Sequence, residues 1–303
     1  MRACLPVLLL LGLLAVGSCG QQTLVQFDPV VPAEVQQRLM WLLQQAAPTL
    51  QQINQTALVD YATLPAGSIV IGFGNTSQAN TYITHEELTA LGPEGFVVRS
   101  AFPAQGVTTL VTNGNAAAHL KPFKAWNNIG LHFGAYQLLK ELGYGFPHPL
   151  QPLIPSAFRL PSGPVSLAEV PRWPVRGWHY HTEHPLELTE FLNGMDSGST
   201  PWASMKPEFA QFAEWLVAQR QNRLEFILLW TREWDAFAWS TTRQQRVTEI
   251  VEVLHTWGVA AGADVPIAEE QQHAWYWTGP RYTQAQQHAN ITKHIDWLMG
   301  PQC

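Results

Sequence analysis

Charged residues are scarce in this chain. Only 13% of its 303 residues are Asp, Glu, Lys or Arg, the formal net charge is −6, and no basic tract interrupts the sequence. Binding to a phosphate backbone requires clustered Lys and Arg, so we expect no nucleic-acid partner.

Cysteine is also scarce. The three cysteines are Cys4, Cys19 and Cys303. Cys4 belongs to an N-terminal leader, and the other two lie at opposite ends of the mature chain. This distribution excludes a disulfide framework and zinc sites of the paired-cysteine type.

The first 19 residues have the pattern of a signal peptide. Arg2 precedes an apolar run, residues 5–16, that is too short to span a bilayer. Residues 16–19, Val-Gly-Ser-Cys, resemble the bacterial lipobox and predict a lipidated Cys19. The alternative is an ordinary secretory signal, which three glycosylation sequons, at Asn54, Asn75 and Asn290, favour. Either reading predicts an exported protein, in the cell envelope or secreted, that touches a membrane only through a lipid anchor.

What the chain does have is tryptophan, concentrated in its second half. Of the 13 Trp residues, only Trp41 and Trp126 precede residue 170. An indole ring can stack on a sugar face while its N–H reaches a hydroxyl, so this enrichment favours a carbohydrate partner. The alternative for any single Trp is a place in the core.

Residues 21–163 read as a small N-terminal α/β domain. Apolar runs predict strands, and 3.6-residue periodicity predicts helices that end at Pro48 and Gly143. The predicted strands cover 24–27, 68–73, 95–102 and 108–112, and the predicted helices cover 32–47 and 128–142. Six prolines between residues 147 and 164 then predict a semi-rigid spacer.

Residues 170–303 alternate strand and helix patterns three times. Strands are predicted at 175–181, 224–230 and 258–267, and helices at 208–221, 242–257 and 284–299. Such alternation is typical of a parallel sheet in a barrel or a doubly wound fold. A whole (β/α)8 barrel takes about 250 residues, so this region has room for only part of one. The predicted fold class is therefore α/β, with a small α/β domain followed by about three βα units of a partial barrel.

Four phrases carry a resemblance to a known family. They are Ser-Ile-Val-Ile-Gly at 68–72, Glu-Gly-Phe-Val-Val at 94–98, Gly-Ala-Tyr-Gln-Leu-Leu at 134–139 with Leu-Gly-Tyr at 142–144, and Val-Arg-Gly at 175–177. They resemble two-domain glycoside hydrolases of the β-N-acetylhexosaminidase and α-glucuronidase type, in which a small α/β domain precedes a catalytic barrel. The chain departs from the hexosaminidase pattern at His181, where those enzymes have Asp, so it looks like a divergent relative.

The ends of the predicted barrel strands supply the candidate substrate-binding residues, since barrel active sites form there. The resemblance assigns Arg176 to substrate hydroxyls. The candidates are Arg176, His179, His181, Trp230, Trp234, Gln272 and His273. Two alternatives stay open for the histidines: metal binding together with Glu183, or a purely structural role in the sheet.

The leading hypothesis is an exported glycoside-hydrolase-like protein that acts on a polysaccharide or glycan without a cofactor or metal. The resemblance places the catalytic carboxylate pair on later strands, beyond Cys303, so the 303-residue chain alone is predicted to be inactive. The alternative is a non-catalytic carbohydrate-binding lipoprotein.

Overall fold

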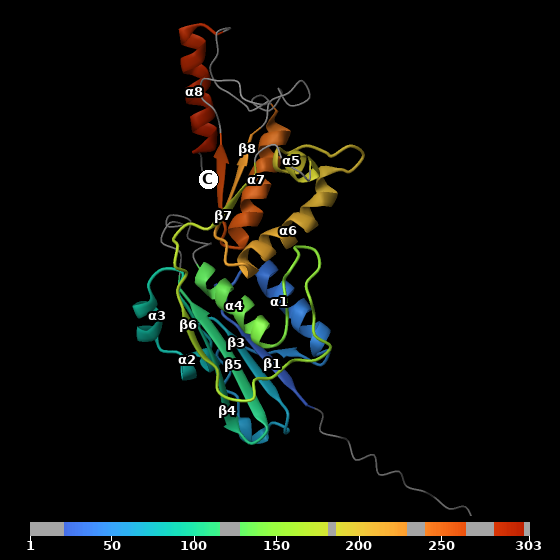
Figure 1. The fold of residues 1–303 in the computed structure, drawn as a ribbon, viewed down its shortest axis with the longest axis vertical. Helices are drawn as coiled ribbons and strands as arrows, with labels where there is room; N and C mark the ends of the chain where they lie inside the picture. Colours follow the sequence, from blue (N-terminus) through green and yellow to red (C-terminus); the bar gives the residue numbers. More distant parts are fainter. Residues whose placement is uncertain (1–20, 116–127, 181–185, 229–239, 265–281, 300–303) are drawn as a thin grey trace, which may run out of the picture.

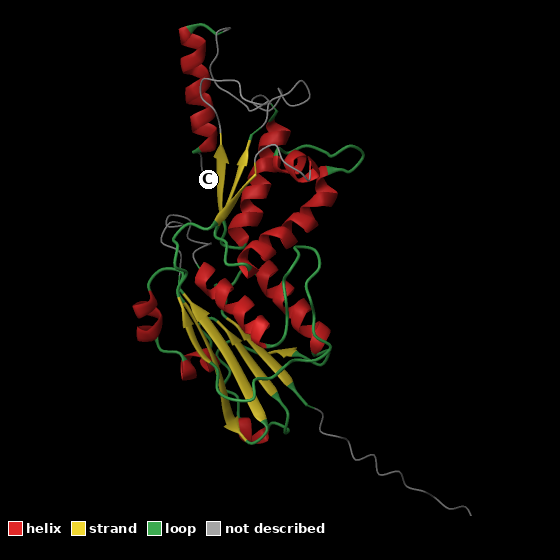
Figure 2. Cartoon of the chain, in the orientation of Figure 1, coloured by secondary structure: helices red, strands yellow, loops and turns green. Residues whose placement is uncertain are grey.

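The computed structural model describes residues 21–115, 128–180, 186–228, 240–264 and 282–299. Over these residues the chain forms two units stacked along one long axis, each built on its own β-sheet (Figures 1 and 2). Within these residues no helix is both long and apolar enough to cross a membrane.

The first unit is a six-stranded mixed sheet in the order β2-β1-β3-β5-β4-β6. Strands β2, β1, β3 and β5 run parallel, whereas β4 is antiparallel to both β5 and β6. The strands are β1 (Thr23–Phe27), β2 (Gln51–Gln52), β3 (Ile69–Phe73), β4 (Phe96–Ala104), β5 (Val107–Gly114) and β6 (Ser166–Glu169).

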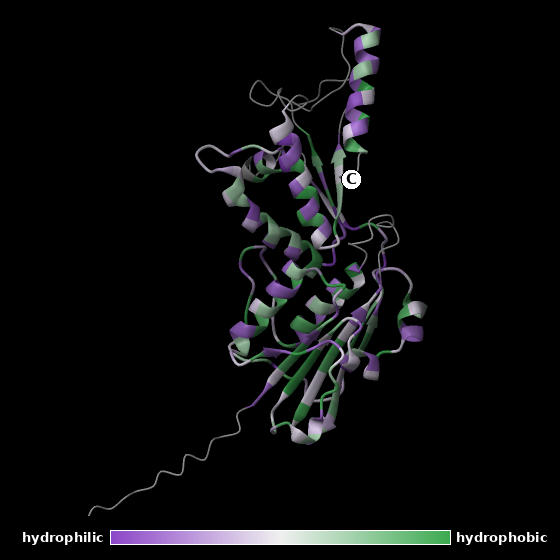
Figure 3. Cartoon of the chain, turned by 180° about the vertical axis from the view of Figure 1, so that it is seen from behind, coloured by the Kyte–Doolittle hydropathy of each residue, from purple (hydrophilic) through white to green (hydrophobic). Residues whose placement is uncertain are grey.

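Helices cover both faces of this sheet. The long helices α1 (Ala33–Ala46) and α4 (Ile129–Glu141) lie on one face, and the short helices α2 (Ser77–Tyr82) and α3 (His85–Leu91) lie on the other (Figure 1). Central strands β1 and β3 are buried along their whole length, as expected for parallel strands covered on both sides. Figure 3 shows the resulting apolar strands from behind.

The second unit is a three-stranded parallel sheet in the order β7-β8-β9. The strands are β7 (Gly177–Tyr180), β8 (Arg223–Ile227) and β9 (Ala260–Asp264). Its helices are α5 (Leu186–Leu192), α6 (Trp202–Ala218), α7 (Thr241–Thr256) and α8 (Gln284–Leu298). Alternate residues of β8 (Leu224, Phe226 and then Leu228 just beyond it) pack into the core against the helices, and the partly exposed Arg223 and Glu225 lie on the other face.

The two units share one hydrophobic core. It runs without a break from α1 and α4 of the first unit to α6, α7 and β8 of the second. A buried polar group crosses this core: Glu214 on α6 accepts hydrogen bonds from Tyr136 on α4 (2.9 Å) and from Arg38 on α1 (2.8 Å). Burial raises the pKa of Glu214, and the Arg38 guanidinium opposes that rise. The two units therefore pack directly against each other through this continuous core.

An ion pair and a neighbouring asparagine connect the segments that precede three strands, β4, β7 and β8. Arg176, just before β7, lies 2.5 Å from the carboxylate of Glu94, just before β4. Asn222, just before β8, donates to the other oxygen of Glu94 (2.9 Å) and accepts from the backbone N–H of Arg176 (2.8 Å). Both charged side chains are almost buried, with 13% and 6% of their surfaces exposed. This cluster, the Glu94–Arg176–Asn222 junction, fixes where the second sheet begins.

Removing the cation of this junction should destabilise the fold strongly. Arg176→Met leaves the Glu94 carboxylate buried without its main partner, and breaking a buried pair in this way costs about 3–5 kcal/mol. Urea unfolding of the parent chain and the variant measures the loss. Lys206→Met is the matched control, because the Lys206–Glu249 pair is more exposed and should cost less than about 1 kcal/mol. Equal losses in the two variants would contradict the junction's structural role.

Three buried histidines make the fold sensitive to acid. His132 on α4 is buried, and its Nδ1 lies 2.9 Å from the carbonyl oxygen of Trp257. No described residue offers its Nε2 a hydrogen-bond partner. Burial lowers the pKa of His132 and of His255, and it lowers the pKa of His294 on α8 to about 4.

Stability should therefore fall as the pH drops below about 6.5, the pKa of an unfolded histidine. The folded state has the lower pKa and the unfolded state binds the proton, so each such group can cost up to about 2 kcal/mol at pH 5. Urea unfolding at pH 7.5 and pH 5 measures this loss. His132→Phe should show a smaller loss than the parent chain, and an unchanged loss would exclude His132 as a contributor.

The sequence-based α/β prediction and the parallel, sequential order of the second sheet are confirmed. The expected strands and helices of the second unit fall within a few residues of their predicted positions, except that α6 begins six residues earlier. Residues 166–169, between the proline-rich spacer and β7, form strand β6 of the first sheet. Helices α2, α3 and α5 were not predicted.

Candidate functional site

The second sheet carries a cluster of polar side chains on the face that turns away from α6 and α7. His179 on β7 and Glu225 on β8 are direct partners in the strand register, and Gly262 on β9 is the next residue across. Arg223 precedes Glu225 by two residues, so it points to the same side. Asp264 is paired with Ile227 and shares this face as well. We call this group of His179, Arg223, Glu225 and Asp264 the polar face.

Glu225 is the centre of the polar face. Its Oε1 lies 2.5 Å from Nε of Arg223, and its Oε2 lies 3.4 Å from Nδ1 of His179. The Arg223 contact is ionic rather than a well-aligned hydrogen bond. The side chains of His179, Arg223 and Glu225 are 44%, 43% and 36% exposed, so the group lies at the surface of the described part of the chain.

Gly262 makes room for this carboxylate. A Cβ at position 262 would lie 2.8 Å from Cγ of Glu225, too close for any other residue without a shift of the glutamate. The missing side chain thus lets Glu225 lie directly against the backbone of β9.

Aromatic side chains occupy the opposite face of β7. Trp178 and Tyr180 alternate with His179 and point towards α6, where Trp178 lies 5.8 Å from Trp215 and Tyr180 lies 5.9 Å from Phe212. Burial of Tyr180 raises the pKa of its hydroxyl, so this group stays a neutral donor and acceptor. Trp178 and Trp215 therefore pack against each other on the α6 side of the sheet, and neither lies on the polar face.

Arg176, which the resemblance assigned to substrate hydroxyls, lies at the other end of the sheet. Its guanidinium contacts Glu94, donates to the carbonyl oxygen of Arg220 (2.6 Å) and to that of Trp173, and sits 5.4 Å from the ring of Phe133. These contacts engage the guanidinium at the amino-terminal end of β7, away from the strand ends where barrel sites form. We interpret Arg176 as a junction residue, and its contact with substrate is a prediction that this arrangement does not support.

Of the other predicted site residues, the structure describes only His179, which it brings next to Glu225. The rest lie outside the described residues: Cys19, His181, Trp230, Trp234, Gln272 and His273. Their predicted roles in lipidation and sugar binding stay predictions.

Sequence reasoning missed Arg223, Glu225 and Asp264 as a group. The strand predicted at 224–230 left Glu225 without an assigned role. The signal was the alternation of Arg223 and Glu225 with Leu224 and Phe226, which is typical of a strand with one open face. Among the described residues, no three His, Cys, Asp or Glu side chains are grouped so as to hold a metal ion.

Comparison with known proteins identifies no family and finds distant structural neighbours. No family model matches the chain, and no curated protein matches it. Two solved structures resemble it at low similarity. The first is CpGH84D (TM-score 0.45, 10% identity over 92% of this chain and 39% of that one). The second is the GH115 4-O-methyl-α-glucuronidase BtGH115A, with specificity for decorated arabinogalactans (TM-score 0.48, 16% identity over 81% of this chain and 29% of that one). Both are glycoside hydrolases. The chain thus spans well under half the length of either structure.

Proposed function

We propose that this chain provides a carbohydrate-binding surface of a glycoside-hydrolase-type protein, and that the polar face contacts the sugar. The observation that carries the proposal is the exposed group of His179, Arg223 and Glu225, with Asp264 on the same side. It sits on a sheet whose opposite face is packed against helices. A polysaccharide or glycan is the proposed ligand class.

The polar face has the hydrogen-bonding capacity that sugar hydroxyls require. A hydroxyl both donates and accepts, so it is recognised best where acceptors and donors stand side by side. Glu225 accepts and Arg223 donates, and the partly exposed ring of His179 lies beside them. Because Arg223 and His179 hold Glu225 in place, the carboxylate is oriented before the ligand arrives, and less side-chain freedom is lost on binding.

We further propose that hydrolysis is carried out by a longer protein of which this chain is a part. Cleavage of a glycosidic bond requires two carboxyl groups on either side of it, one of them able to donate a proton. Glu225 lies against the Arg223 cation, so this carboxylate is already engaged in an ion pair. We therefore propose that the acid pair follows on later strands, and that this chain alone binds without cleaving. The partial barrel, the export signal and lipidation at Cys19 are parts of the same proposal.

One observation favours the second candidate function, a carbohydrate-binding protein without catalysis. The carboxylate at the centre of the polar face is committed to an ion pair, and binding requires nothing more than the acceptor it provides. The two candidates share the ligand class and differ only in whether the ligand is cleaved.

Glu225→Gln should weaken carbohydrate binding about tenfold or more. The substitution keeps the shape of the side chain and removes the charge, and a hydrogen bond to a charged group contributes about 1.5–3 kcal/mol. A panel of plant, fungal and bacterial glycans identifies a ligand by affinity electrophoresis, and calorimetry on that ligand then measures the loss. Glu252→Gln, on the exposed side of α7, is the control and should bind as the parent chain does. Failure of every glycan to bind, or equal affinity of the two variants, would refute the proposal.

A further inference from the structure

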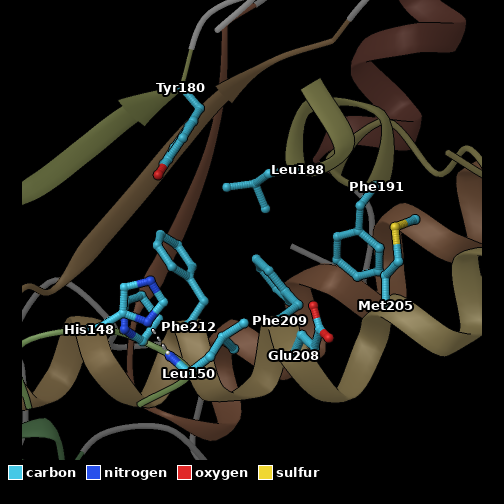
Figure 4. A pocket seen from close by; sticks show the side chains of 10 residues that line it. His148, Leu150, Tyr180, Leu188, Phe191, Met205, Glu208, Phe209 and Phe212 are labelled. Atoms are coloured by element: carbon cyan, nitrogen blue, oxygen red, sulfur yellow. Dashed lines mark hydrogen bonds between the residues drawn. The ribbon is translucent and has the colours of Figure 1, made fainter. Parts of the chain in front are cut away.

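A cavity lies on the opposite side of β7 from the polar face. It has a volume of about 400 Å³ and opens at the seam between the proline-rich segment, β7, α5 and α6. Figure 4 shows its lining side chains converging on one space. Tyr180 forms one wall, and it points away from the side that His179 faces, so this cavity is separate from the polar face.

The walls of this cavity are aromatic. Phe209 lies 5.0 Å from Phe191 and 6.1 Å from Phe212, and Phe212 lies 5.9 Å from Tyr180, between ring centroids. Leu188 and Met205 complete the apolar lining (Figure 4). A cavity of this size and lining has the properties of a small-molecule site, in which apolar walls supply contact and a few polar groups set the orientation.

The charge in the cavity is of one sign. Glu208 on α6 is exposed and contributes a carboxylate to the lining, whereas no Lys or Arg is among the described residues that line it. Lys206, two residues away, is paired with Glu249 at 2.7 Å. His148 also lines the cavity, and its Nδ1 accepts a hydrogen bond from the backbone N–H of Leu150 (3.1 Å).

Aromatic faces and a carboxylate together are the chemistry that recognises organic cations. The negative face of an aromatic ring attracts a positive charge, and quaternary ammonium groups bind in clusters of such rings. An anionic ligand would meet Glu208 with no counter-charge, and a sugar would leave most of its hydroxyls against apolar walls without partners.

We propose that this cavity, the aromatic cavity, binds a small organic cation: a quaternary ammonium or protonated amine that carries an apolar or aryl group. The apolar group occupies the space between Leu188, Phe191 and Met205, and the cation lies against the rings near Glu208. This function is independent of the carbohydrate site.

Binding of benzyltrimethylammonium tests the proposal, with benzyl alcohol and phenylacetate as the neutral and anionic probes. Titrations followed by NMR of 13C-methyl-labelled methionine report on the site directly, because Met205 lines the cavity and its signal is assigned by its loss in Met205→Leu. The cation should shift the Met205 signal and bind at least tenfold more tightly than either other probe. Phenylacetate binding as tightly as the cation, or an unmoved Met205 signal, would overturn the proposal.

Two variants and one control separate charge from shape. Glu208→Gln should weaken the cation about tenfold and leave benzyl alcohol unchanged, whereas Leu188→Trp should fill the cavity and abolish binding of both. Circular dichroism checks that each variant is folded. If Leu188→Trp is not, Met205→Trp replaces it, with binding read by calorimetry because this variant lacks the Met205 signal. Glu86→Gln, an exposed carboxylate on α3 of the first unit, should leave all three probes unaffected. Equal cation affinity in Glu208→Gln and the parent chain would contradict the assigned role of the carboxylate.

Discussion

The nearly buried ion pair between Arg176 and Glu94 is the contact on which the arrangement of the two sheets depends. Glu94 stands in a left-handed backbone conformation (φ 61°) at the turn before β4, a position that few residues other than glycine adopt. From there its two oxygens reach Arg176 and Asn222, the residues that precede β7 and β8. The amino-terminal ends of the second sheet are thereby fixed to the first unit. The carboxyl-terminal ends of its strands point away from the first unit, along the long axis of the molecule (Figure 1).

Alternation along β7 then gives the second sheet two chemically different sides. His179 joins Glu225 and Arg223 on the polar face, while Trp178 and Tyr180 face α6, and Tyr180 forms one wall of the aromatic cavity. A one-residue slip of β7 against β8 would exchange these sides. The junction opposes such a slip, because Arg176 is held by Asn222 through its backbone and by Glu94 through its side chain.

The sequence predicted what depends on local pattern. The helical periodicity of residues 242–257 and the strand pattern of residues 224–230 are local, and both elements appear within one to three residues of their predicted positions. The partners of Arg176 are not local: Glu94 lies 82 residues away, and nothing in the spacing of either residue indicates that they meet. Spacing alone therefore could not indicate that the fold engages this guanidinium in the junction. Its contact with a substrate stays a prediction. Glu225 was overlooked for a related reason, since one carboxylate in an apolar run reads as an interruption until a neighbouring strand places His179 beside it.

A double-mutant cycle on Glu94→Gln and Arg176→Met tests the junction most directly. Glutamine keeps the shape of the side chain, and its amide oxygen can still accept from Asn222, so the cycle isolates the charge pairing with Arg176. Urea unfolding of the parent chain, both single variants and the double variant gives the coupling free energy. If the ion pair holds the sheets together, we expect a coupling of at least about 2 kcal/mol, as for groups that share one buried network. A coupling below about 0.5 kcal/mol, the value of independent sites, would show that the ion pair does not hold the two sheets together.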